Sequence, residues 1–181
     1  RKFGFSVSQT MSIAQRLYES GLITYMRTDS TDLSELALNT AKKCIENLYG
    51  SKYAKRRTYK TKSKGAQEAH EAIRPTYLDR TSIEGTAQEQ KLYDLIWKRT
   101  IASQMADARL EKTDIEIVSG DITEKFLAEG SQVLFDGFLK VYMESHDDDL
   151  GSEDADLLPA LTVGQKMNQQ EVTATEKYTA K

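Results

Sequence analysis

Tyr25 and Arg27 are the two residues whose types and spacing best suit covalent chemistry on a phosphate group. Tyr25 lies within the short apolar run 22–26 and Arg27 directly follows it. The run predicts an extended segment, on which side chains two apart point the same way. A phenol, with a pKa near 10, is a poor nucleophile at neutral pH, but a neighbouring guanidinium stabilises the phenolate and binds phosphate through paired N–H groups. The pair suits formation of a phosphotyrosine bond. On spacing alone, a packed tyrosine and an arginine in a surface ion pair are the better explanation, because such pairs are common.

A second feature is the basic segment 51–65, which contains seven Lys or Arg residues, no acidic residue, and the interleaved Tyr53 and Tyr59. Such a segment can follow a phosphate backbone while its aromatic rings stack on unpaired bases. The wider charge distribution agrees, because residues 1–80 have a balance of +7 (15 basic, 8 acidic). Residues 81–181 have a balance of −10 (10 basic, 20 acidic). A nucleic-acid partner is the favoured interpretation; a solvated loop and two oppositely charged halves packed together are the alternatives.

His70 and Arg74 lie in the run 69–75, which we expect to contain a helical turn over residues 67–73 that ends before Pro75. The His-Glu pair is not a zinc-protease motif, because Arg74 stands where the second histidine would be. His70 remains a candidate phosphate donor or proton carrier, with a structural histidine as the alternative. The acidic run 147–149 is interpreted as part of a solvated loop rather than a magnesium site.

Composition excludes several classes of protein. One cysteine, Cys44, allows no intramolecular disulfide, and with two histidines it also excludes a Cys/His zinc cluster. No apolar run approaches the length of about 18 residues that a membrane helix needs. There is no glycine-rich phosphate loop of the kind that binds ATP. A reducing, cytoplasmic location fits best. The chain begins without Met or a signal sequence, and we interpret it as part of a longer protein.

Hydrophobic spacing predicts helices in the first half and strands in the second. Helical periodicity predicts three helices. The first spans residues 8–20, the second runs from a capping box at Asp32 and Glu35 to Gly50, and the third runs from a second box at Thr86 and Glu89 to about residue 105. After residue 107 the period alternates, predicting strands around 115–117, 126–128, 133–135, 139–143, 161–163 and 172–174. Turns are expected at 120–121 and 129–130. The predicted fold class is α+β, with a helical part followed by an antiparallel β part.

Two longer strings resemble a known family. Residues 8–30, SQTMSIAQRLYESGLITYMRTDS, and residues 67–76, QEAHEAIRPT, are similar to bacterial DNA topoisomerase I, a type IA topoisomerase. Weaker similarity continues through LYDLIW at 92–97 and LFDGF at 134–138, so the resemblance covers most of the chain.

The resemblance implies an activity. In that family, the tyrosine matching Tyr25 attacks one DNA strand and keeps its 5′ phosphate as a covalent ester, a second strand passes through the gap, and the break is resealed without ATP. This relaxes negatively supercoiled DNA. The arginine matching Arg27 positions the scissile phosphate, and the histidine matching His70 contacts DNA near the same site. Arg74 is carried over as a possible contact to the DNA backbone.

The resemblance also implies a domain organisation. Residues 1–106 would form the helical domain with the nucleophilic tyrosine, and residues 107–181 part of a β-rich arch or hinge domain. The family's acidic domain, which binds Mg²⁺, has no counterpart in this sequence. We therefore expect no metal site in this chain, partnership with the remaining domains of the same enzyme, and no DNA relaxation by the chain alone. The alternatives are a non-catalytic module that binds single-stranded DNA and a protein-docking β domain.

Overall fold

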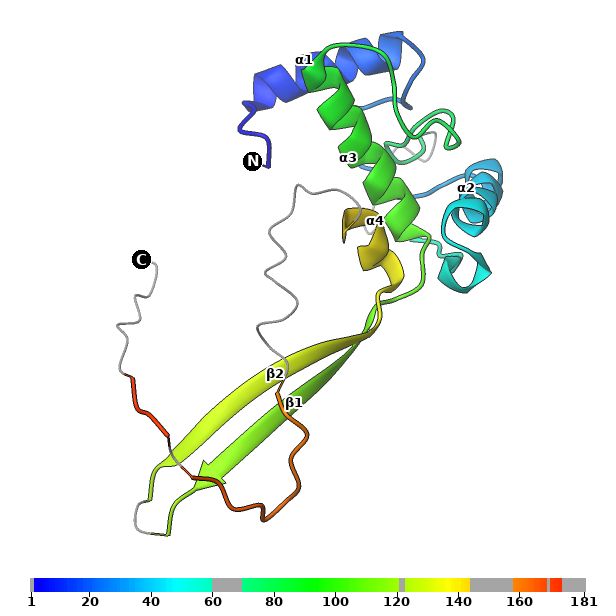
Figure 1. Cartoon of the computed structure of the whole chain (residues 1–181). Helices are drawn as coiled ribbons and strands as arrows, with labels where there is room; N and C mark the ends of the chain where they lie inside the picture. The colour runs from blue at the N-terminus through cyan, green and yellow to red at the C-terminus, as the bar shows by residue number, and fades with distance from the viewer. Residues whose placement is uncertain (1, 60–69, 121–122, 144–157, 169, 174–181) are drawn as a thin grey trace.

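The computed structural model describes residues 2–59, 70–120, 123–143, 158–168 and 170–173. These residues form a helical body and a long two-stranded ribbon that extends away from it (Figure 1). The body contains α1 (Val7–Glu19), α2 (Glu35–Leu48), α3 (Ala87–Ser103) and the short α4 (Lys140–Met143). The ribbon consists of β1 (Arg109–Val118) and β2 (Lys125–Phe135). The predicted α+β class, helices first and antiparallel strands second, is confirmed in this form.

Side-chain caps determine where the three long helices begin. The Oγ of Ser6 accepts a hydrogen bond from the backbone N–H of Gln9 at the start of α1. Thr86 and Glu89 form the reciprocal capping box predicted for α3. The box predicted at Asp32 for α2 is wrong, because Ser34 is the N-cap and its Oγ accepts from the N–H of Ala37. Asp32 lies two residues before the cap, and its carbonyl accepts from the N–H of Ala72 instead.

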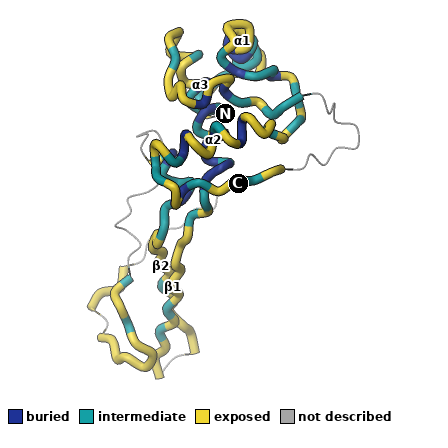
Figure 2. Tube along the Cα trace, turned by 90° about the vertical axis from the view of Figure 1, so that its right-hand side faces the viewer, coloured by how far each residue is buried: buried dark blue, intermediate teal, exposed yellow. Residues whose placement is uncertain are grey.

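The hydrophobic core lies wholly within the helical body (Figure 2). Apolar side chains from one face of each helix meet there, as helical periodicity requires. The ribbon, by contrast, is coloured almost entirely as exposed or intermediate. The largest fully buried side chains of the body include Ile13 and Leu17 of α1, Ile45 of α2, Tyr93 and Ile101 of α3, and Val141 of α4.

The ribbon pairs β1 and β2 over their whole length, from Arg109 opposite Phe135 to Val118 opposite Lys125. The turn predicted at residues 129–130 is wrong, because Gly130 lies inside β2 opposite Thr113. The sequence suggested a break there because the apolar residues change phase between 128 and 133. With neither face of the ribbon covered by described residues, no core forces one phase, and a single strand continues through. Of the other expected turn, Gly120 lies in the connection between the strands and residue 121 lies outside the described residues.

The strand predicted over residues 139–143 is also wrong. A 3₁₀ turn, Gly137–Leu139, leads into α4, and Val141 is buried against the core. Gly137 makes this return possible. Its φ is +51°, and a Cβ at this position would lie 2.5 Å from the carbonyl carbon of Asp107. Tertiary packing against α3 and the preceding chain therefore overrides the alternating pattern.

Two other expected elements are not found. His70–Ile73 are not helical, because Ala72 forms hydrogen bonds with Asp32 and Thr24 rather than with its own segment; residues 67–69 lie outside the described residues. Leu161, Val163 and Val172 are not in strands, since none of them has a strand partner among the described residues. Residue 174 and the acidic run 147–149 also lie outside the described part of the chain.

Candidate active site

Tyr25 lies just after α1, on a short segment that is anchored on both sides. Two residues after α1, Gly21 has φ +68° and allows the N–H of Leu22 to turn back to the carbonyl of Leu17. Ile23 is buried and forms an isolated antiparallel bridge with Pro75, and Met26 is also buried. Tyr25, between these two anchors, is half-buried. Its backbone is therefore fixed while part of its side chain remains accessible.

Tyr25 and Arg27 line one open groove of about 640 Å³, so the structure brings the predicted pair together. Its opposite wall is one face of α1, where successive turns contribute Ser8, Met11, Ser12, Gln15 and Arg16. None of the described residues that line the groove has a carboxylate, whereas two have guanidinium groups. A groove with this lining can accept a phosphate backbone without charge repulsion.

Arg16 is a groove residue that our sequence reasoning missed. Its Nε donates to Oε1 of Glu89 at 2.6 Å, which joins α1 to the capping box of α3. The hydrogen bonds from Arg16 and Thr86 lower the pKa of the Glu89 carboxyl to about 2. The available signal was the helical spacing of Ser8, Ser12 and Arg16, which places all three on one face of α1.

His70 is the third predicted residue that the structure places at this site. Its ring contacts that of Tyr25, with centroids 5.2 Å apart and planes inclined by 36°. Tyr18 of α1 contacts the same Tyr25 ring edge-on at 5.4 Å. Although 45 residues separate Tyr25 from His70 in the sequence, the Ile23–Pro75 bridge brings their two segments side by side. Tyr25, Arg27 and His70 thus belong to one site.

Arg74 is in a different situation, because its guanidinium is engaged within the protein. Nη2 donates to Oε2 of Glu71 at 2.6 Å, and Nη1 donates to the carbonyl of Pro75 at 2.9 Å. The side chain is only 12% exposed. These contacts favour a structural role for Arg74 over the predicted contact with DNA.

The described part of the basic segment is also largely engaged. Lys55 and Arg57 both pair with Asp107, and Arg56 pairs with Glu35. Tyr53 is buried, and its hydroxyl donates to Asp136, so it cannot stack on a base as the sequence suggested. Tyr59 is 40% exposed, with its hydroxyl donating to the carbonyl of Ser103. Residues 60–65 lie outside the described residues. The segment's described half therefore ties the base of the ribbon to the helical body.

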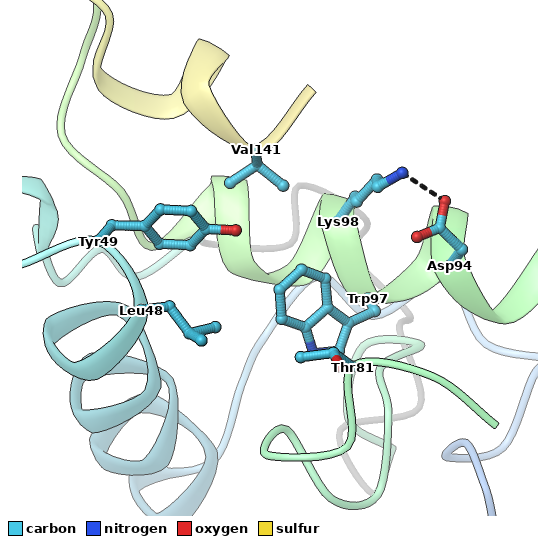
Figure 3. Close-up of a pocket in the computed structure, with 7 residues that line it drawn as sticks. All are labelled: Leu48, Tyr49, Thr81, Asp94, Trp97, Lys98 and Val141. Atoms are coloured by element: carbon cyan, nitrogen blue, oxygen red, sulfur yellow. Dashed lines mark ion pairs between the residues drawn. The ribbon is translucent and has the colours of Figure 1, made fainter. Parts of the chain in front are cut away.

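A second hollow, of about 260 Å³, lies between α2, α3 and α4 and is lined by the residues drawn in Figure 3. The indole of Trp97 and the side chain of Val141 face it, and Lys98 is held by Asp94 at 2.6 Å. Trp97 also donates to the carbonyl of Leu78. Its charged groups, Lys98 and Asp94, pair with one another, so the hollow is better explained as imperfect packing where α4 meets the body.

The described residues contain no cluster of three or more His, Cys, Asp or Glu side chains suited to a metal ion. The groove beside Tyr25 likewise offers no carboxylate among its described lining residues. The described residues around the tyrosine therefore do not by themselves fit a Mg²⁺ site. No helix among the described residues has the length and apolar character needed to cross a membrane.

Comparison with known proteins gives the family of this chain and a matching fold. The DNA topoisomerase family model matches residues 1–181. DNA topoisomerase 1 of Synechococcus elongatus is 48% identical over 183 residues, 96% of this chain and 20% of that protein. DNA topoisomerase 1 of Zymomonas mobilis is 45% identical over 185 residues, 99% of this chain and 15% of that protein. The full-length topoisomerase I structure from Thermotoga maritima matches with a TM-score of 0.65 at 36% identity, over 80% of this chain and 25% of that one.

The chain therefore belongs to the DNA topoisomerase family, in its type IA branch of bacterial topoisomerase I. The resemblance read from residues 8–30 and 67–76 is confirmed at this level. The chain spans only about 15–20% of the length of these two curated relatives.

Proposed function

We propose that this chain is the part of a type IA topoisomerase that carries the nucleophile, Tyr25, for transient cleavage of one DNA strand. The observation that supports this most strongly is that Tyr25 and Arg27 line one groove while the His70 ring contacts Tyr25, in a chain of that family. The groove is open along α1, which suits an extended single strand better than a compact small molecule.

The proposed reaction is a reversible phosphoryl transfer. The hydroxyl oxygen of Tyr25 attacks the scissile phosphorus and loses its proton, and the P–O3′ bond breaks. The 5′ phosphate remains on the tyrosine, while the departing 3′ oxygen takes up a proton. Resealing is the same step in reverse, with the 3′ hydroxyl attacking the phosphotyrosine. One phosphodiester replaces another at each step, so the cycle requires no ATP.

Each residue has a role in this proposal. Arg27, exposed on the same groove, binds the scissile phosphate and neutralises the charge that builds during attack. His70 contacts the Tyr25 ring and is within reach of the same phosphate region. Arg74, committed to Glu71 and Pro75, contributes through the fold of its segment.

The remaining assignments follow from the same proposal. Residues 1–106 form the tyrosine-bearing domain and residues 107–181 begin the arch, with negatively supercoiled or single-stranded DNA as the substrate. Mg²⁺ binds in the acidic domain of the complete enzyme, outside this chain, and no step above is routed through it. Action on chromosomal DNA places the enzyme in the cytoplasm. The 181-residue chain alone does not relax DNA.

The test is a chimera in which this chain replaces the matching segment of the Synechococcus elongatus enzyme. The chimera should relax negatively supercoiled plasmid and form a covalent DNA adduct that peptide mapping assigns to Tyr25. Tyr25→Phe should abolish both, because phenylalanine has no nucleophilic oxygen. The matched control is Tyr18→Phe, which removes the hydroxyl of a neighbouring tyrosine but keeps the ring that contacts Tyr25.

Two outcomes would contradict the proposal. One is a folded chimera without relaxation activity, and the other is an adduct that maps to a residue other than Tyr25. Relaxation that survives Tyr25→Phe while deletion of residues 52–64 abolishes DNA binding would favour the non-catalytic single-strand-binding module instead.

A further inference from the structure

The segment that carries His70 is fastened to the rest of the site along both of its edges. On one edge, the N–H of Thr24 donates to the carbonyl of Arg74 at 2.9 Å, and Thr24 Oγ1 donates to the carbonyl of Ala72 at 2.8 Å. Thr24 is the residue immediately before Tyr25. On the other edge, the N–H of Ala72 donates to the carbonyl of Asp32 at 2.8 Å. The position of His70 relative to Tyr25 therefore depends on these hydrogen bonds on both edges of its segment.

Glu71 supplies the charged part of that fastening. One carboxylate oxygen accepts from the backbone N–H of Ser34, the N-cap of α2, at 2.6 Å. The other accepts from Nη2 of Arg74 at 2.6 Å. Partial burial by itself raises the pKa of this carboxyl, but the hydrogen bonds from Arg74 and Ser34 outweigh it, and the pKa lies below its ordinary value. Glu71 is thus ionised and occupied on both oxygens.

The other hydrogen bonds of Arg74 support its ion pair with Glu71. Besides Glu71, its guanidinium holds the carbonyl of Pro75, which follows it in the chain and bridges to Ile23. Its Nε is buried and has no hydrogen-bond partner among the described residues. A buried N–H without a partner lowers the stability of the fold. We take its presence here as a sign that the other contacts of the Arg74 guanidinium outweigh this loss.

We propose that Glu71 is a positioning residue for the Tyr25 reaction: by joining Arg74 to the amino-terminal end of α2, its carboxylate holds the His70 ring against Tyr25. This inference rests on the proposed function and extends it to a residue that touches neither Tyr25 nor the groove. Glu71 lies next to His70 in the chain, and the following residue, Ala72, is hydrogen-bonded to both neighbouring segments: its N–H donates to the carbonyl of Asp32, and its carbonyl accepts from Thr24 Oγ1. Loss of the carboxylate frees the His70 end of the segment first.

The experiment measures single-turnover cleavage of a labelled single-stranded oligonucleotide by the chimera described above, carrying Glu71→Gln. Glutamine keeps the size and one acceptor but loses the charge. At saturating DNA the cleavage rate should fall about ten- to a hundredfold, as expected for a misplaced catalytic group, while the dissociation constant for DNA stays unchanged. Arg74→Lys removes the forked guanidinium and should shift the rate in the same direction. Unfolding midpoints show that the variants remain folded.

A matched control and a double variant separate positioning from general damage. Glu35→Gln removes another ion-paired carboxylate at the start of α2, the one that binds Arg56, and should leave the cleavage rate unchanged. In a His70→Ala background, Glu71→Gln should cause no further loss, because both changes remove the same contribution.

The outcomes distinguish the two proposals. Cleavage unaffected by Glu71→Gln, or slowed as much in the His70→Ala background as without it, overturns the positioning role and leaves Tyr25 as the nucleophile. A chimera that forms no adduct at Tyr25 overturns the proposed function itself.

Discussion

The helical body and the β1–β2 ribbon contain similar proportions of apolar residues but place them differently. In the body, apolar side chains of four helices are removed from water together, and the candidate site sits on this rigid support. In the ribbon, Leu127 is 70% exposed and Val118 69% exposed. The strands are held by their mutual hydrogen bonds and by the contacts of their body-side end with the helical body. Packing thus positions the candidate nucleophile within the body, whereas the ribbon is positioned through its junction with the body.

A matched pair of alanine substitutions tests this difference between body and ribbon and should give the largest effect. Ile101→Ala, at a fully buried position in α3, should lower the free energy of unfolding by about 2–5 kcal/mol because it leaves a cavity. Leu127→Ala, on the ribbon, should change it by less than about 0.5 kcal/mol. Denaturant titration followed by the fluorescence of Trp97, which is buried in the same core, measures both. Equal effects at the two positions would show that the ribbon has a core of its own.

The junction itself can be tested at Gly137. Gly137→Ala should cost about 1–3 kcal/mol, because it combines a positive φ with a Cβ that collides with the backbone of Asp107. Hydrogen exchange should rise in α4 and at the base of the ribbon but not in α1. Gly120→Ala is the control, since a Cβ there meets nothing within 4 Å. Faster exchange in α1 as well would mean that junction and site unfold together.

The smallest expected effect concerns the ion pair between α1 and α3. The folded-state pKa of Glu89, about 2, lies below the ordinary value of 4.5. Its stabilising contribution is therefore complete above about pH 4.5 and is lost as the pH falls toward 2. Stability measured across this window should depend less steeply on pH in Glu89→Gln than in the unmodified chain.

Arg16→Gln should reduce the same pH dependence, because the hydrogen bond from Arg16 is the largest cause of the shift. If Glu89→Gln and the unmodified chain show the same profile between pH 2 and 4.5, the α1–α3 pair does not stabilise the body.

Local patterns predicted those features that depend on neighbours in the sequence. The helical spacing of α1, α2 and α3 and the capping box at Thr86 follow from interactions within one or two turns. Tyr25 and Arg27 line the same groove as expected, although their segment is not a strand but bends at Thr24, Met26 and Arg27. The predicted break in β2 and the predicted strand at 139–143 were wrong because burial, not alternation, decides such elements. The ribbon lacks the buried face that would select a phase, and α4 gains one only by packing on α3.

What the sequence by itself determined is the family, the main helices and the identity of the candidate nucleophile with its arginine. Tertiary structure alone decided which distant groups meet: His70 against Tyr25, Glu71 at the start of α2, Arg16 between the groove and Glu89, and Tyr53 buried at the base of the ribbon. The physical reason is that these contacts join residues dozens of positions apart. No local periodicity encodes them. His70 meets Tyr25 because the segments around Ile23 and Pro75 are bridged, and the other contacts form as their own elements pack around the common core.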